Sequence, residues 1–181
     1  MNQNSITAQP SSPIPKDNRR RHRDVADPDK DRSRSHLGIV GDTYTILLSG
    51  EDTNGRYCLI DMHIPPGGGP PPHRHNFEES FTILEGRITA TFRGKKSVYQ
   101  AGQTLHIPAN APHSFTNASK HPARLLCICG PAGQEDLFRA VGVPVATRTT
   151  PPPKPDKASQ SALAVKTASL LPKYRTEMLK V

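Results

Sequence analysis

The chain has 181 residues, including 19 prolines, 13 glycines and no tryptophan, and its formal net charge is +8 at pH 7. This length fits one domain with appended segments, and the three cysteines do not form the even-numbered framework of a disulfide-rich protein. The sequence holds no apolar run of membrane-spanning length and no apolar signal segment behind its first charges. We therefore expect a cytoplasmic protein that does not act at a membrane.

Much of the positive charge lies in residues 1–36, which contain almost no large apolar side chains. The basic run at residues 19–23 is followed by aspartates that alternate with further basic residues. This composition favours a solvated, disordered tail. Because neither interleaved aromatic residues nor a helix-turn-helix pattern accompanies the charge, we expect no specific nucleic-acid partner.

From residue 42 onward, short alternating segments separated by turn residues predict an all-β domain that spans residues 37–146. The expected strands are 43–49, 57–64, 80–84, 87–92, 97–100, 104–107, 113–117 and 123–128. In the second of these, alternation places Met62 and Ile64 on one side and His63 on the other, so His63 is predicted to lie outside the barrel. The three cysteines fall in similar apolar runs and are expected to be buried free thiols.

The C-terminal part of the chain has two further segments. Residues 147–160 are rich in proline, which cannot join the interior of a sheet, and they read as an extended linker. Residues 161–181 carry apolar side chains at helical spacing, which predicts a short amphipathic helix packed on the outside of the barrel or on a partner chain. Residues 176–179 are a candidate for a small added strand.

Four residues have the chemistry of a metal site. His73 and His75 are two positions apart, so on a strand they point to the same side. Glu79 follows closely, and His113 can be brought to them by the fold. Three imidazole nitrogens and one carboxylate oxygen suit Fe, Mn, Ni, Cu or Zn, and leave coordination positions for water, dioxygen or a substrate. The sequence therefore predicts one divalent transition-metal site.

These residues lie in two blocks that resemble the two motifs of the cupin superfamily. The first block holds Gly67, His73, His75, Glu79 and Gly86, and the second holds Gly102, Pro108, His113 and Asn117. The resemblance implies a jelly-roll barrel, also called a double-stranded β-helix, with His73, His75, Glu79 and His113 as metal ligands. Asn110 stands where the family usually has glycine, and asparagine is the residue that best replaces glycine at positive φ.

The chain also resembles small single-domain bacterial cupins related to quercetin 2,3-dioxygenase, on its proline-rich connector and the segment 138–144. Strand parity places five apolar side chains around the metal, namely Met62, Ile64, Phe81, Ile83 and Phe115. To these it adds one of two alternating sets, Leu126 and Ile128 or Cys127 and Cys129. An apolar pocket suits a hydrophobic or aromatic substrate better than a phosphorylated sugar.

Together these features favour a metal-dependent dioxygenase that acts on a small enolic or aromatic, flavonol-like substrate, with Glu79 both as ligand and as the catalytic base. Two alternatives remain open. One is a non-catalytic cupin that binds a small molecule, and the other is a metal-dependent isomerase or epimerase of a polar substrate. A homodimer is expected because jelly-roll sheets expose edge strands, and two-fold dimers are the commonest closed assembly.

Overall fold

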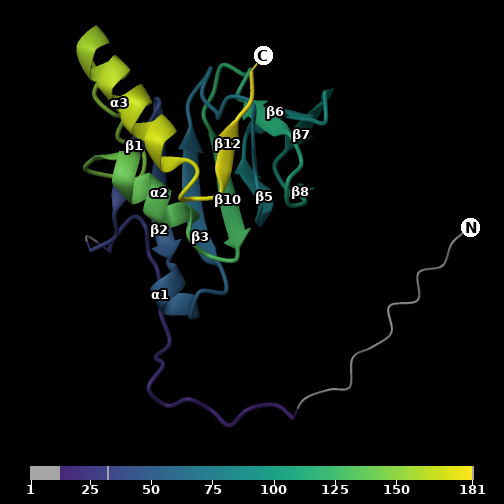
Figure 1. The fold of residues 1–181 in the computed structure, drawn as a ribbon, viewed down its shortest axis with the longest axis vertical. Coiled ribbons are helices and arrows are strands. Elements are labelled where there is room, and N and C mark those ends of the chain that lie inside the picture. The colour runs from purple at the N-terminus through teal and green to yellow at the C-terminus, as the bar shows by residue number, and fades with distance from the viewer. Residues whose placement is uncertain (1–12, 32, 181) are drawn as a thin grey trace, which may run out of the picture.

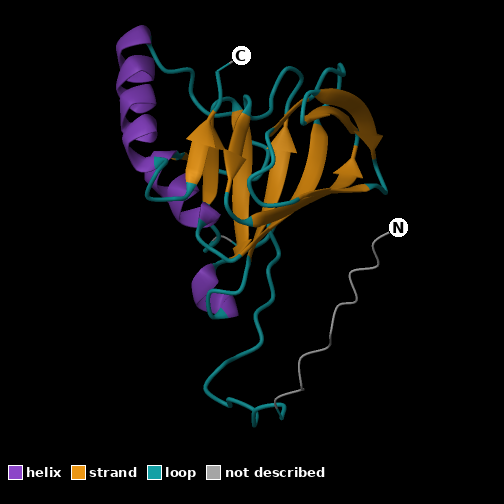
Figure 2. Ribbon diagram, turned by 45° about the vertical axis from the view of Figure 1, so that its right-hand side comes forward, coloured by secondary structure: helices purple, strands orange, loops and turns teal. Residues whose placement is uncertain are grey.

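Two antiparallel sheets face each other and enclose the apolar core, and the helices gather on one side of them (Figure 2). The structure is a computed structural model that describes residues 13–31 and 33–180. Of the expected N-terminal tail, residues 1–12 and residue 32 lie outside the described residues. The last residues of the expected tail contact the folded domain. Arg34 donates to the carbonyl oxygen of Leu47 at 2.8 Å, and the first strand begins at His36.

The strands and helices follow in chain order (Figure 1). The strands are β1 His36–Ile39, β2 Asp42–Leu48, β3 Cys58–Ile64, β4 His73–His75, β5 Glu78–Glu85, β6 Arg87–Phe92, β7 Lys95–Gln100, β8 Thr104–Ile107, β9 His113–Thr116, β10 Ala123–Gly130, β11 Val143–Pro144 and β12 Thr176–Met178. The helices are α1 Gly50–Thr53, α2 Gln134–Val141 and α3 Lys157–Leu170. The seven-stranded sheet has the order β11-β1-β2-β3-β10-β5-β8, and the five-stranded sheet has the order β12-β4-β9-β6-β7.

This two-sheet architecture confirms the expected all-β fold class, and every expected strand is present within two residues of its bounds. Alternation explains the core: on β3, Met62 and Ile64 are buried, whereas His63 lies on the opposite, partly exposed side, as expected. Two helices were not anticipated. The connector 50–55 contains α1, where Ser49 and Asp52 form a capping box, and α2 follows β10 with two acidic residues in its first turn.

The C-terminal extension reaches back to the barrel. Helix α3 begins at Lys157, inside the segment expected to be linker, and packs on α2 through a small apolar cluster that includes Leu137, Val141, Leu163 and Leu170. Packing of this helix on a partner chain stays a prediction. The chain then forms β12 (Figure 1), which pairs with the outer edge of β4. None of the helices in the described part of the chain is both long and apolar enough to cross a bilayer.

The glycine loop, residues 67–69, precedes β4 and is hydrogen bonded to Asn117, the residue that follows β9. The backbone N–H of Gly67 donates to the carbonyl oxygen of Asn117 at 2.8 Å, and the N–H of Asn117 donates to that of Gly68 at 2.8 Å. At Gly69 φ is +124°, and a Cβ there would collide with the backbone of Phe115. Only glycine therefore fits at this close approach to β9.

We expect Gly69→Ala to lower the free energy of unfolding by about 2–4 kcal/mol, because it adds both backbone strain and a steric clash. Gly67→Ala is the matched control: φ is +81° there, but nothing lies within 4 Å of the added methyl group. Its cost should be about 1 kcal/mol, from strain alone. Urea unfolding curves of the two variants measure the difference, and equal losses would contradict the close approach.

Candidate metal centre

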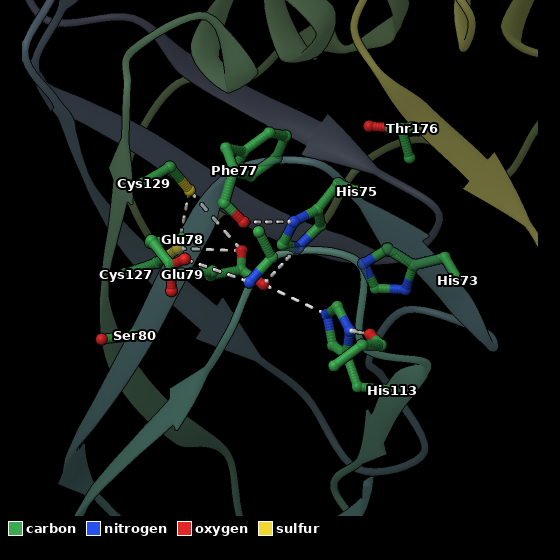
Figure 3. A network of polar contacts seen from close by, with 12 residues as sticks. His73, His75, Phe77, Glu78, Glu79, Ser80, His113, Cys127, Cys129 and Thr176 are labelled. Atoms are coloured by element: carbon green, nitrogen blue, oxygen red, sulfur yellow. Dashed lines mark hydrogen bonds and ion pairs between the residues drawn. The ribbon is translucent and has the colours of Figure 1, made fainter. Parts of the chain in front are cut away.

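The four residues singled out in the sequence converge on one point inside the barrel (Figure 3). His73 and His75 come from β4, Glu79 from β5 and His113 from β9, so the two sheets both contribute. Each offers one ligand atom, and these atoms all lie within 4.8 Å of one another. None of the four residues is more than 8% exposed. The fold therefore brings the whole expected ligand set together in a buried place.

Backbone carbonyl groups fix the orientation of all three imidazole rings. Each Nδ1 atom lies 2.9 Å from a carbonyl oxygen, and in chain order these oxygens belong to Pro71, Phe77 and Ala111. A carbonyl oxygen can only accept, so each Nδ1 carries the hydrogen and donates it. In the neutral ring the lone pair is then on Nε2, which is the arrangement typical of metal-binding histidines.

One oxygen of Glu79 lies against two of these rings. Its Oε2 is 3.0 Å from Nε2 of His75 and 3.2 Å from Nε2 of His113. An imidazole protonated on both nitrogens can donate from Nε2 to this oxygen, whereas neutral rings would turn lone pairs toward it and repel it unless a cation lay among them. The donor set of three imidazole nitrogens and one carboxylate oxygen fits a divalent transition metal.

The electrostatics of the site favour the protonation states that metal binding needs. Burial raises the pKa of Glu79, but the contacts with His113 and His75 outweigh burial and hold this pKa below its usual range. Burial, reinforced by the neighbouring His113, lowers the pKa of His73 from 6.5 to about 4. At neutral pH the carboxylate is ionised and His73 is neutral, as coordination to a metal requires.

Two thiols contact the other oxygen of the same carboxylate. Cys127 and Cys129, on β10, donate to Oε1 of Glu79 at 3.3 Å and 3.6 Å. Their inward position decides which of the two alternating sets faces the core, because Leu126 and Ile128 lie on the more exposed side of the strand. The cysteines are buried free thiols, as expected. Their contact with Glu79 was missed, because it depends on the pairing of β10 with β5.

The turn before β9 supports the ligand strand. Asn110 has φ of +68°, the conformation expected for a residue that replaces glycine. Its backbone N–H donates to the carbonyl oxygen of His75 at 2.7 Å. Glu78, the neighbour of Glu79, points away from the site and is exposed. The hydrogen bond from Asn110 therefore holds β4 in place at His75, which is a candidate ligand.

The five expected pocket residues all belong to the main apolar core, and none is more than 3% exposed. The rings of Phe81 and Phe115 meet edge to face, with centroids 5.2 Å apart. His75 stacks on Phe77, a residue whose side chain was expected only to fill a bend, at a centroid distance of 3.8 Å. The surroundings of the centre are thus apolar and aromatic; that they line a substrate pocket stays a prediction.

Comparison with known proteins gives the same family as the two sequence motifs. The sequence profile of the family described as "Cupin domain" matches residues 60–129. The chain is 29% identical over 108 residues to quercetin 2,3-dioxygenase of Bacillus subtilis (strain 168), an alignment that covers 59% of this chain and 32% of that enzyme. It is 34% identical over 77 residues to an uncharacterized protein of Methanocaldococcus jannaschii, covering 42% of this chain and 62% of that protein.

Among solved structures, an RmlC-like cupin from Shewanella frigidimarina is similar with a TM-score of 0.50 and 15% identity, over 61% of this chain and 96% of that one. At this identity the likeness concerns the fold alone. The chain spans between 32% and 62% of the length of the two curated relatives. The family match at residues 60–129 includes the four candidate ligands, and the similarity extends over only part of each curated relative.

The pKa of His73 makes the stability of the metal-free protein depend on pH. Between pH 6.5 and about 4 the unfolded chain binds a proton at this residue and the folded chain does not, so acid favours unfolding. We expect the free energy of unfolding to fall by about 3 kcal/mol through this window. Urea unfolding at several pH values measures the slope.

His73→Gln should flatten this slope, and His121→Gln, which changes an exposed histidine, should leave it unchanged. An equally steep slope in His73→Gln would show that other groups cause the acid sensitivity.

Proposed function

The chain belongs to the cupin superfamily, and from this premise we propose that it is a metal-dependent oxygenase of a small enolic or aromatic, flavonol-like substrate. The observation that carries the proposal is the convergence of three carbonyl-oriented imidazoles and one ionised carboxylate at a buried point. The partial similarity to quercetin 2,3-dioxygenase supports the same reaction class.

His73, His75, Glu79 and His113 would hold the metal ion. When bound, a divalent transition metal supplies a Lewis acid that favours the deprotonated form of a substrate hydroxyl and brings it together with dioxygen. The carbonyl oxygens behind the rings keep all three Nε2 atoms aimed at the same point. Because these partners are backbone atoms of the barrel, the orientation does not depend on mobile side chains.

Glu79 is the residue placed to move a proton. Its Oε2 faces the centre, and its pKa lies below the usual range, so at neutral pH it is an acceptor. The thiols of Cys127 and Cys129 hold its other oxygen. In this proposal Oε2 takes the proton from the hydroxyl of the substrate, while the contacts of Oε1 with Cys127 and Cys129 keep the carboxylate in place.

The residues around the centre bear on whether the substrate is an apolar enol or a polar compound. Among the described residues, no hydrogen bond or ion pair joins a lysine or arginine to the four candidate ligands, whereas aromatic rings pack beside them. This environment favours an apolar enol over the polar substrate of an isomerase or epimerase. The low exposure of the four ligands favours a second candidate function, that of a non-catalytic cupin that binds a small molecule.

The expected homodimer and the expected cytoplasmic location stay predictions. The seven-stranded sheet ends on β11 and β8, and the five-stranded sheet ends on β12 and β7. Outer strands of this kind are the places where a second chain can add to a sheet.

The test combines metal analysis with oxygen uptake. Protein purified without chelator is expected to contain a transition metal by elemental analysis, and to consume dioxygen with at least one enolic or flavonol compound. Glu79→Gln keeps the size of the side chain but removes its charge, and should lower the rate of oxygen uptake by about 100-fold or more. Glu78→Gln is the matched control, because Glu78 is exposed and points outward, and its rate should stay unchanged.

Two results would contradict the oxygenase. One is metal-replete protein that consumes no oxygen with any compound of a broad enol and flavonol panel. The other is full activity of Glu79→Gln. Tight binding of such compounds without turnover would instead favour the non-catalytic binder.

A further inference from the structure

A row of three inward-facing polar side chains crosses the seven-stranded sheet. Glu79 on β5 is the direct partner of Cys129 on β10, and Cys129 is in turn the direct partner of Cys58 on β3. Cys127 lies on the same face of β10 as Cys129, beside Phe81. The three cysteines are at most 1% exposed. Donor atoms of the kind that bind metals are therefore concentrated on the side of Glu79 that faces away from the histidines.

Three of these atoms form a triangle of the size that a tetrahedral metal ion requires. The two Sγ atoms of Cys127 and Cys129 are 3.6 Å apart, and they lie 3.3 Å and 3.6 Å from Oε1 of Glu79 (Figure 3). Tetrahedral Zn²⁺, with bonds of about 2.3 Å to sulfur and 2.0 Å to oxygen, places two sulfurs about 3.8 Å apart and a sulfur and an oxygen about 3.5 Å apart. The observed triangle matches these edges within a few tenths of an ångström.

We propose that Glu79, Cys127 and Cys129 form a second metal site, for a thiophilic divalent cation such as Zn²⁺, which shares Glu79 with the histidine site. Oε2 faces the imidazoles and Oε1 faces the thiols, so the carboxylate is placed to bridge two ions. Carboxylate-bridged pairs of ions are a known form of protein metal centre. The second site does not depend on which reaction, if any, occurs at the first.

The charges of the interior permit such an ion. Without metal the two thiols are neutral and donate hydrogen bonds to Oε1. When a divalent cation binds, the two S–H bonds break, both protons leave to solvent, and two S–metal bonds form. The cation and the two thiolates cancel in charge, so the buried region gains no net charge and the desolvation cost of an added ion is largely avoided.

Cobalt(II) is a direct probe, because a thiolate bound to it gives a ligand-to-metal charge-transfer band in the near ultraviolet. Reduced, metal-free protein is titrated with CoCl₂, both in the folded state and during refolding, since the thiols are almost inaccessible in the fold. We expect two equivalents of cobalt to bind, one of them with the thiolate band and with the release of two protons.

Variants assign the band to particular residues. The double variant Cys127→Ala, Cys129→Ala should lose the band and one of the two equivalents of cobalt, and keep the other. Cys58→Ala is the matched control, because it removes a buried thiol of the same row and leaves the three proposed ligands. It should keep both equivalents and the band.

The proposal is overturned if fully reduced wild-type protein shows no thiolate band in either loading experiment, or if the double variant keeps the band. Should the double variant fail to fold, X-ray absorption of zinc-loaded wild-type protein decides instead. Sulfur neighbours at about 2.3 Å support the site, and a first shell of nitrogen and oxygen alone overturns it.

Discussion

The candidate site is built around one buried carboxylate. Glu79 is ionised inside an apolar barrel, and an isolated anion there would cost several kcal/mol. Its neighbours are two imidazole nitrogens on one oxygen and two thiols on the other. The rings stabilise the carboxylate where they donate from Nε2, but a neutral ring that donates from Nδ1 to its carbonyl oxygen turns a lone pair inward and supplies no positive charge. A cation among the ligands would supply the missing positive charge, so the arrangement suits a metal centre.

The position of the ligands couples the site to the packing of the two sheets. Glu79 and the thiols belong to the seven-stranded sheet, and the histidines belong to the five-stranded one. The histidine strand β4 is only three residues long, and contacts from outside it keep it in place. The glycine loop fastens its start, Asn110 binds the carbonyl oxygen of His75, and β12 covers its outer edge. The C-terminal extension is thus part of the framework that positions the candidate ligands.

Much of the fold was predictable because β-strand alternation is a local property. The main strands, the outward position of His63 and the positive φ of Asn110 all follow from residues close to one another in sequence. Two of the missed elements have weak local signals. Helix α1 has four residues and β11 has two, and β11 exists only because it pairs with β1, which is distant in sequence.

The sequence by itself determined the all-β class, the four candidate ligands and the burial of the cysteines, because residue spacing and alternation carry that information. It left open which face of β10 meets the core, and it gave no sign that the thiols contact Glu79 or that β12 returns to the ligand strand. Those features were decided by the tertiary structure. They depend on the register between strands that are far apart in the chain, and that register is set by the packing of the whole barrel.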